Sequence, residues 1–145
     1  MATTLSRTIS LLPGEETWTD YTVNVVATFS RGEGYGIIVR ATGSTYYIFS
    51  VEMVNNCFSA IRVRGNSEVW VARKSFRDIG GGWTFPRRPE KHYITITAKG
   101  DHFTMTFNGI EVLNFRDSHY PTGRVGIGKW FGSDVAFESI TIQRN

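Results

Sequence analysis

The acidic residues are the first candidates for chemistry, because hydrolysis of a glycosidic bond generally needs two carboxylates about 5–10 Å apart. The acids within strand-like segments are Glu52, Glu68, Glu111 and Glu138, and their spacing pairs none of them on one strand face. Carboxylates brought together only by the fold remain an alternative, so a small glycoside-acting enzyme stays open as the less favoured function. No Gly-x-Ser-x-Gly sequence is present, which leaves a serine hydrolase of that type unsupported.

The residues that commonly ligate metals show no metal-binding pattern. His92, His102 and His119 have no metal-ligand spacing relative to Cys57 or to one another, and we expect the histidines to face solvent. Calcium is a separate case, because turn acids and backbone carbonyls can hold it without a conspicuous motif. The acids available for calcium are Asp20, Asp134 and Glu15, which form no ligand series. We therefore expect no cofactor and assign no metal ligand.

Arginine is the residue type that points most directly to a ligand. The chain has twelve arginines and four lysines and a formal net charge of +3. A guanidinium group matches carboxylate, sulfate or phosphate groups, so an acidic ligand is one interpretation and a solvated surface is the other. The arginines are spread along the chain, and no basic run is longer than the Arg-Arg pair between Pro86 and Pro89. We therefore expect no nucleic-acid partner.

Aromatic side chains suggest what the arginines would help to bind. Proteins often hold a sugar with a stacking ring and a few hydrogen-bonding side chains. Trp83 and Phe85 lie in a glycine-rich, proline-bounded segment, and Trp130 ends a strand-like run beside a Gly-Ser turn. We predict that Trp83 and Trp130 contact the ligand, with a lid over the core as the alternative for Trp83. Trp18 and Trp70 are expected to pack in the core or at a sheet edge.

The elements that would position these residues are β-strands. Tyr93–Ala98 and Phe103–Phe107 alternate apolar and β-branched polar residues with a period of two, which is typical of half-buried strands. Lys99-Gly100-Asp101 joins them, and Asn108-Gly109 leads into a third run at Ile110–Phe115. Short runs of this kind recur along the chain, giving about eleven strands and no helical periodicity. The sequence predicts an all-β, two-sheet antiparallel sandwich that forms a single domain over residues 1–145.

The alternation also assigns side chains to faces. On two strands Tyr47, Ile61 and their alternate neighbours are expected to face the core. Arg40, Glu52 and Arg62 then fall on the opposite side, and we expect them to line one outer face if their strands are neighbours. Arg40 would either bind ligand there or pair with a carboxylate, with Glu52 as the partner.

Composition limits the location only in part. No apolar run approaches the ~18 residues needed to cross a bilayer, so we expect no membrane association. Met1–Ser10 lacks the apolar centre and cleavage site of a signal peptide. Cys57 is the only cysteine, which excludes an intramolecular disulfide and leaves the compartment undetermined. We therefore expect either an intracellular protein or a mature or excised module.

Several segments, in order, resemble the concanavalin A-like, laminin-G-type jelly rolls. They lie within 18–142 and begin with Trp-Thr-Asp-Tyr at 18–21, Gly-Ile-Ile-Val-Arg-Ala at 36–41 and Tyr-Tyr at 46–47. Later matches are Tyr-Ile-Thr-Ile at 93–96, Asn-Gly at 108–109, Phe-Arg-Asp at 115–117, Gly-Arg-Val-Gly-Ile at 123–127 and Ala-Phe-Glu-Ser-Ile at 136–140. Within that superfamily the chain looks most like glycosidase-associated carbohydrate-binding modules and the group of the domain of unknown function 1080.

This resemblance implies two stacked sheets with a ligand on the concave face or at a loop-lined rim, and an extracellular or cell-surface location. The Glu-x-Asp-x-Glu cluster of the laminarinase-type relatives is missing here. We therefore predict a non-catalytic carbohydrate-binding module whose partner is a carbohydrate, acidic or oligosaccharide. Its predicted site residues are Arg40, Glu52, Arg62, Trp83 and Trp130. A protein-interaction or assembly domain is the alternative, with Trp83, Phe85, Trp130 and Phe131 as its exposed patch.

Overall fold

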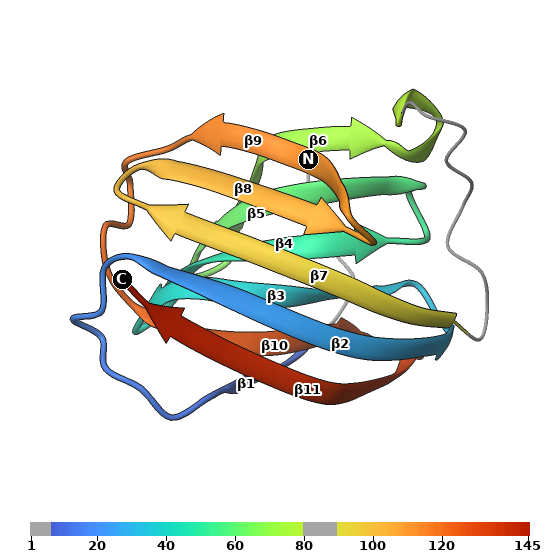
Figure 1. The fold of residues 1–145 in the computed structure, drawn as a ribbon, viewed down its shortest axis with the longest axis horizontal. Coiled ribbons are helices and arrows are strands. Elements are labelled where there is room, and N and C mark those ends of the chain that lie inside the picture. Colours follow the sequence, from blue (N-terminus) through green and yellow to red (C-terminus); the bar gives the residue numbers. More distant parts are fainter. Residues whose placement is uncertain (1–6, 80–89) are drawn as a thin grey trace.

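The computed structural model describes residues 7–79 and 90–145, which form two antiparallel sheets stacked face to face (Figure 1). The six-stranded sheet has the order β1-β10-β3-β4-β5-β6, and the five-stranded sheet has the order β11-β2-β7-β8-β9. The strands are β1 (Arg7–Leu11), β2 (Tyr21–Arg31), β3 (Gly34–Thr42), β4 (Thr45–Glu52), β5 (Cys57–Arg64), β6 (Ser67–Ser75), β7 (Glu90–Lys99), β8 (His102–Phe107), β9 (Ile110–Arg116), β10 (Arg124–Trp130) and β11 (Asp134–Arg144). The predicted all-β sandwich of about eleven strands is confirmed.

Helical structure is nearly absent from the described residues. One short 3-10 turn, η1 (Phe76–Asp78), follows β6. Within residues 7–79 and 90–145, no helix has the length and apolar character needed to span a membrane.

The core between the sheets is built from strict alternation. In β2, Tyr21, Val23, Val25, Ala27 and Phe29 are all buried, as the period-two pattern predicts. They pack against the inner side chains of the six-stranded sheet, such as Tyr35, Ile37 and Phe49. Most alternate residues that face solvent in β2, β7 and β8 are polar, with Val26 and Tyr93 as exceptions, which is why these strands show the pattern most clearly.

The β7–β8–β9 meander has the predicted turns. Ile96 pairs with Met105 and Ala98 with Phe103 in the antiparallel register of β7 and β8. Asn108 and Gly109 both have positive φ, at 49° and 85°, which is the backbone that a two-residue hairpin turn of this type requires.

The six-stranded sheet carries apolar residues on both faces. A second buried cluster lies on its outer face and contains Ile38, Ala41, Ile48, Ile61, Val63 and Trp130. Ile61 pairs directly with Ile48, whereas Ala60 pairs with Phe49 of the inter-sheet core. The expectation that Ile61 shares the core with Tyr47 is therefore wrong, because an apolar run on both faces of a strand does not reveal which face is inside.

Candidate functional site

Arg40 lies on the inner side of β3 because of a β-bulge. Val39 and Arg40 together face a single residue, Val125, since Ile38 pairs with Gly126 and Ala41 with Arg124. Arg40 adopts φ 56°, a left-handed conformation that is uncommon for a residue with a side chain. The extra residue shifts the alternation by one position, so the predicted outer-face location of Arg40 is wrong.

The guanidinium of Arg40 is buried between the sheets at one end of the sandwich. It donates hydrogen bonds to the carbonyl oxygens of Tyr120 at 3.0 Å and Gly100 at 3.1 Å. Its nearest carboxylate is Asp20, at 3.8 Å, and not the predicted partner Glu52. Burial lowers the pKa of the Arg40 guanidinium, and the neighbouring Tyr21, Asp20 and Tyr47 oppose that change. Arg40 thus ties loop ends of both sheets together.

Glu52 and Trp130 do lie on the outer face of the six-stranded sheet, but both are buried there. The Glu52 carboxylate accepts hydrogen bonds from Asn55 Nδ2 at 2.6 Å, from Trp70 Nε1 at 3.0 Å and from the Ser59 hydroxyl. The ring of Trp130 lies 5.2 Å beneath the guanidinium carbon of Arg7. The sequence had placed Arg40, Glu52 and Arg62 on one face. The structure leaves Glu52 on the outer side and places Arg40 and Arg62 on the inner side, and Trp83, another predicted contact, lies outside the described residues.

Arg62 faces the inner side of β5, opposite Tyr47 of β4. Its guanidinium donates to Asp117 Oδ2 at 2.7 Å, while the Tyr47 hydroxyl donates to Oδ1. His119 approaches the same Oδ1, with its backbone N–H and its Nδ1 both 3.0 Å away. Burial alone would raise the pKa of Asp117, but the hydrogen bonds from Tyr47 and His119 and the charge of Arg62 together lower it. Asp117 is thus an ionised anchor for Arg62.

Arg40 and Arg62 therefore hold one loop from two directions. The loop at 117–123 connects β9 to β10, at the left end of the sandwich in Figure 1. Arg62 forms an ion pair with Asp117, the first residue of the loop, and Arg40 donates a hydrogen bond to the carbonyl of Tyr120. The loop is fixed further by the Tyr120 hydroxyl, which donates to the Val63 carbonyl at 3.0 Å.

A groove of about 470 Å³ opens beside this loop, and we call it the end groove. It is lined by Thr45, Arg62, Arg64, Ser67, Val69, His119 and Tyr120. Two cross-strand rows on the inner side of β4, β5 and β6 build its wall. Arg64 is paired with Thr45 on one side and Ser67 on the other, and Arg62 is paired with Val69. Residues opposite one another in a sheet point to the same face, so these side chains converge.

The end groove combines apolar surface with basic groups. Val69 is 47% exposed, and the half-buried ring of Tyr120 packs against Tyr47 with centroids 5.1 Å apart. Arg62, Arg64 and His119 supply charged or ionisable groups, and no carboxylate is among the lining residues. Of these residues sequence reasoning named only Arg62 as a ligand contact. His119 and Tyr120 come from an irregular loop, where periodicity carries no signal.

Two other expectations are corrected by the described residues. His92 is fully buried, with Nδ1 2.6 Å from the Tyr35 hydroxyl, so it does not face solvent. Trp130 is 1% exposed and cannot belong to an exposed aromatic patch, although its neighbour Phe131 is 77% exposed. Phe85, like Trp83, lies outside the described residues. Trp18 and Trp70 pack against the two buried clusters as predicted.

No metal-binding cluster is present in residues 7–79 and 90–145: no three of their histidine, cysteine or acidic side chains come together in a way that could hold an ion. The expectation that the protein has no cofactor stays a prediction, with calcium as its open alternative.

Comparison with solved structures identifies the fold. The carbohydrate-binding module CBM66 from Bacillus subtilis superimposes with a TM-score of 0.82 at 16% identity, covering 97% of this chain and 84% of that one. Chicken galectin 2 matches with a TM-score of 0.65 at 16% identity over 88% of this chain and 93% of that one. A toad ovary galectin in complex with thio-digalactose matches with a TM-score of 0.66 at 10% identity, covering 94% and 98%.

These likenesses confirm a jelly-roll sandwich. No family model matches the sequence, and no curated protein has significant sequence similarity to it. The finer resemblance to laminin-G modules and to the domain of unknown function 1080 group stays a prediction.

Proposed function

We propose that this protein is a non-catalytic carbohydrate-binding module that holds a saccharide in the end groove. One observation carries the proposal: the groove joins an apolar wall to a convergent set of hydrogen-bonding side chains. Sugar rings have apolar C–H faces and polar edges, so such a site matches both parts of the ligand. The jelly-roll likeness to a carbohydrate-binding module and to galectins supports the same ligand class.

The parts of the groove have distinct roles in this proposal. Val69 and the ring of Tyr120 offer apolar surface to the C–H face of a sugar. Arg64 and Ser67 donate to ring hydroxyls or to exocyclic groups from the adjacent row. The volume of about 470 Å³ is in the range of small-molecule sites.

A hydrolytic function at this groove has no support, because no carboxylate lines it. Glycoside hydrolysis generally uses an acid and a second carboxylate on either side of the scissile bond.

A glycan array followed by calorimetry tests the proposal. Val69→Ala should weaken binding of any glycan found, because it removes apolar surface from the groove. Val54→Ala is the matched control, since Val54 has the same 47% exposure and lies in the turn between β4 and β5. Absence of binding to every neutral and acidic glycan at millimolar concentration, in a folded sample, would overturn the proposal.

A further inference from the structure

Basic side chains line the end groove without acidic ones to neutralise them. Its lining contains Arg62, Arg64 and His119 and no acidic residue. Asp117, the acid bonded to the lining residues Arg62 and His119, already accepts hydrogen bonds on both oxygens, including one from Tyr47. The neighbouring strand residue Glu68 does not compensate either, because it forms an ion pair with Arg7 on the outer face. A positive potential therefore faces the groove.

Arg64 is the basic residue of the groove that is left without a partner. It is exposed, and no described residue forms an ion pair with it. It occupies the centre of a three-strand row, with the hydroxyl residues Thr45 and Ser67 directly opposite on either side. Thr45 already bonds Thr42, at 2.9 Å, so its orientation is set. A guanidinium beside a hydroxyl donor is a suitable receptor for an oxyanion.

Arg62 has a different role from Arg64. Its guanidinium is held by Asp117 at 2.7 Å, and its side chain is 22% exposed. It therefore contributes to the potential and keeps the His119 loop in place, but a fixed ion pair limits its own contact with a ligand. Arg62 is a positioning residue, and Arg64 is the binding residue.

Resting on the proposed function, we infer that the end groove selects saccharides that carry an oxyanion, a sulfate ester or a carboxylate, and that Arg64 binds this group. A charge-assisted hydrogen bond is roughly twice as strong as a neutral one, so the charged substituent would dominate selectivity. The apolar wall of Val69 and Tyr120 would then orient the sugar ring that carries the charge.

The experiment compares four probes by calorimetry on the full chain. They are a sulfated chondroitin tetrasaccharide, its desulfated form that keeps the carboxylates, the desulfated and carboxyl-reduced neutral form, and sodium sulfate alone. The sulfated or the carboxylated form should bind on the order of tenfold more tightly than the neutral form, as expected for a charge-assisted contact. That advantage should shrink between about 50 mM and about 300 mM NaCl, because salt screens exposed charges.

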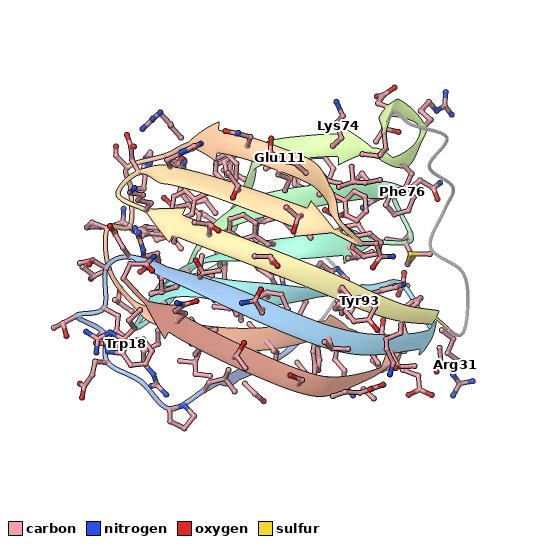
Figure 2. The ribbon with its side chains drawn as sticks, viewed as in Figure 1. Trp18, Arg31, Lys74, Phe76, Tyr93 and Glu111 are labelled. Atoms are coloured by element: carbon pink, nitrogen blue, oxygen red, sulfur yellow. The ribbon has the colours of Figure 1, made fainter. Side chains whose placement is uncertain are left out.

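Two variants assign the effect to a residue. Arg64→Ala should remove the preference for the charged tetrasaccharides and leave weak binding of the neutral one. Arg31→Ala is the matched control: it makes the same change in net charge, and Arg31 lies at the opposite end of the sandwich (Figure 2). It should leave the preference unchanged.

The outcomes separate the inference from the function on which it rests. Equal affinity for the neutral and charged forms would overturn the inference and leave carbohydrate binding intact. An equal loss in Arg31→Ala and Arg64→Ala would also overturn it, because the effect would then be net charge. Sodium sulfate binding as tightly as the sulfated tetrasaccharide would also overturn the inference, because the groove would then hold an oxyanion without recognising a saccharide. No heat with any tetrasaccharide or any array glycan would overturn the proposed function itself.

Discussion

Arg7 and Glu68 form an ion pair of 2.5 Å although they belong to the two opposite edge strands of the six-stranded sheet. Four strands separate β1 from β6, so the pair requires the sheet to curl around its outer face. The Arg7 guanidinium also lies over the ring of Trp130, which is part of the apolar cluster on that face. The outer face is thus filled by its own side chains and closed, while the end groove is open.

This ion pair should stabilise the fold more than a surface pair does. The Arg7 and Glu68 side chains are 5% and 22% exposed, so removing either partner leaves a poorly solvated charge. A double-mutant cycle on Arg7→Ala and Glu68→Ala, measured by chemical denaturation, should give a coupling energy of about 1–3 kcal/mol. The exposed pair of Lys91 and Glu138 is the control and should couple more weakly. Equal coupling in both pairs would contradict a role for Arg7 in closing the sheet.

The Arg40 side chain should contribute to the stability of the fold. Arg40→Ala removes a fully buried side chain and its two hydrogen bonds, to the carbonyls of Tyr120 and Gly100, and should lower the free energy of unfolding by about 3 kcal/mol. Arg40→Lys should lower it less, because one of the two carbonyls can still be reached by a cation. Thermal melts and denaturant titrations measure both variants. An unchanged melting temperature in Arg40→Ala would contradict the buried role of this side chain.

Arg40 shows why alternation predicts a strand more reliably than it predicts the face on which a side chain lies. Alternation predicted the strands correctly wherever one face is polar, as in β2 and in the β7–β8–β9 meander. It failed on β3, because a single bulge at Val39 and Arg40 moves every later residue to the other face. A bulge costs little and has no marker in this sequence, since neither residue is a glycine. The face of Arg40 could be determined only from the pairing of β3 with β10.

The end groove could not be predicted for a different reason. One wall comes from the pairing of Arg64 with Ser67 and with Thr45. The β5–β6 turn sets the first pairing, with Gly65 at positive φ, and the β4–β5 turn sets the second, with Asn56 at positive φ. The glycine turn is visible in the sequence. The opposite wall, His119 and Tyr120, reaches the groove through contacts between residues more than fifty positions apart, such as Tyr120 with Val63. Such contacts follow from the packing of both sheets and not from local pattern.

Acid should weaken the anchor at Asp117. The pKa of this carboxyl is lower in the folded protein than in the unfolded chain, so the unfolded chain takes up the proton first as the pH falls. Its contribution to stability is therefore fully present above the unfolded pKa, about 4, and is lost as the pH falls through the folded pKa. Asp117→Asn should be less stable than the parent at neutral pH, and the difference should narrow toward pH ~3.

Asp101→Asn is the control for this pH dependence. Asp101 forms an exposed pair with Arg116, with side chains 47% and 69% exposed. Its substitution should therefore change the free energy of unfolding less than Asp117→Asn does. A constant gap between the parent and Asp117→Asn across the acid range would contradict an ionised Asp117 in the folded state.

Cys57 should be unreactive in the folded protein. Its thiol is fully buried, and burial raises its pKa, as does the nearby charge of Glu52, while Arg73 opposes these effects. A thiol reagent such as dithionitrobenzoate should therefore label no cysteine in native protein at neutral pH and one cysteine after unfolding. Rapid labelling of the native protein would contradict the burial of the Glu52 and Cys57 pair of β4 and β5.

Gly123, the glycine of the loop that forms the end groove, should tolerate no side chain. It has φ 147°, and a Cβ there would lie 2.2 Å from the carbonyl carbon of Arg40. Its carbonyl accepts a hydrogen bond from the Tyr21 hydroxyl at 2.9 Å, which in turn accepts one from the Arg40 backbone N–H at 2.8 Å. Because the clash is with backbone, Gly123→Ala must move the loop or the bulge. We expect a loss of more than about 2 kcal/mol, together with loss of ligand binding.

Gly43→Ala separates steric clash from backbone strain. Gly43 also has positive φ, at 56°, but a Cβ there meets nothing within 4 Å. Its replacement should cost only the strain of a left-handed alanine, about 1 kcal/mol, and should leave the groove intact. Denaturant titrations and the tetrasaccharide titration measure both variants. Equal losses of stability and of binding in the two variants would contradict this account. They would mean that the loop at 117–123 can move without harm, so that the close packing of Gly123 on Arg40 does not hold His119 and Tyr120 at the groove.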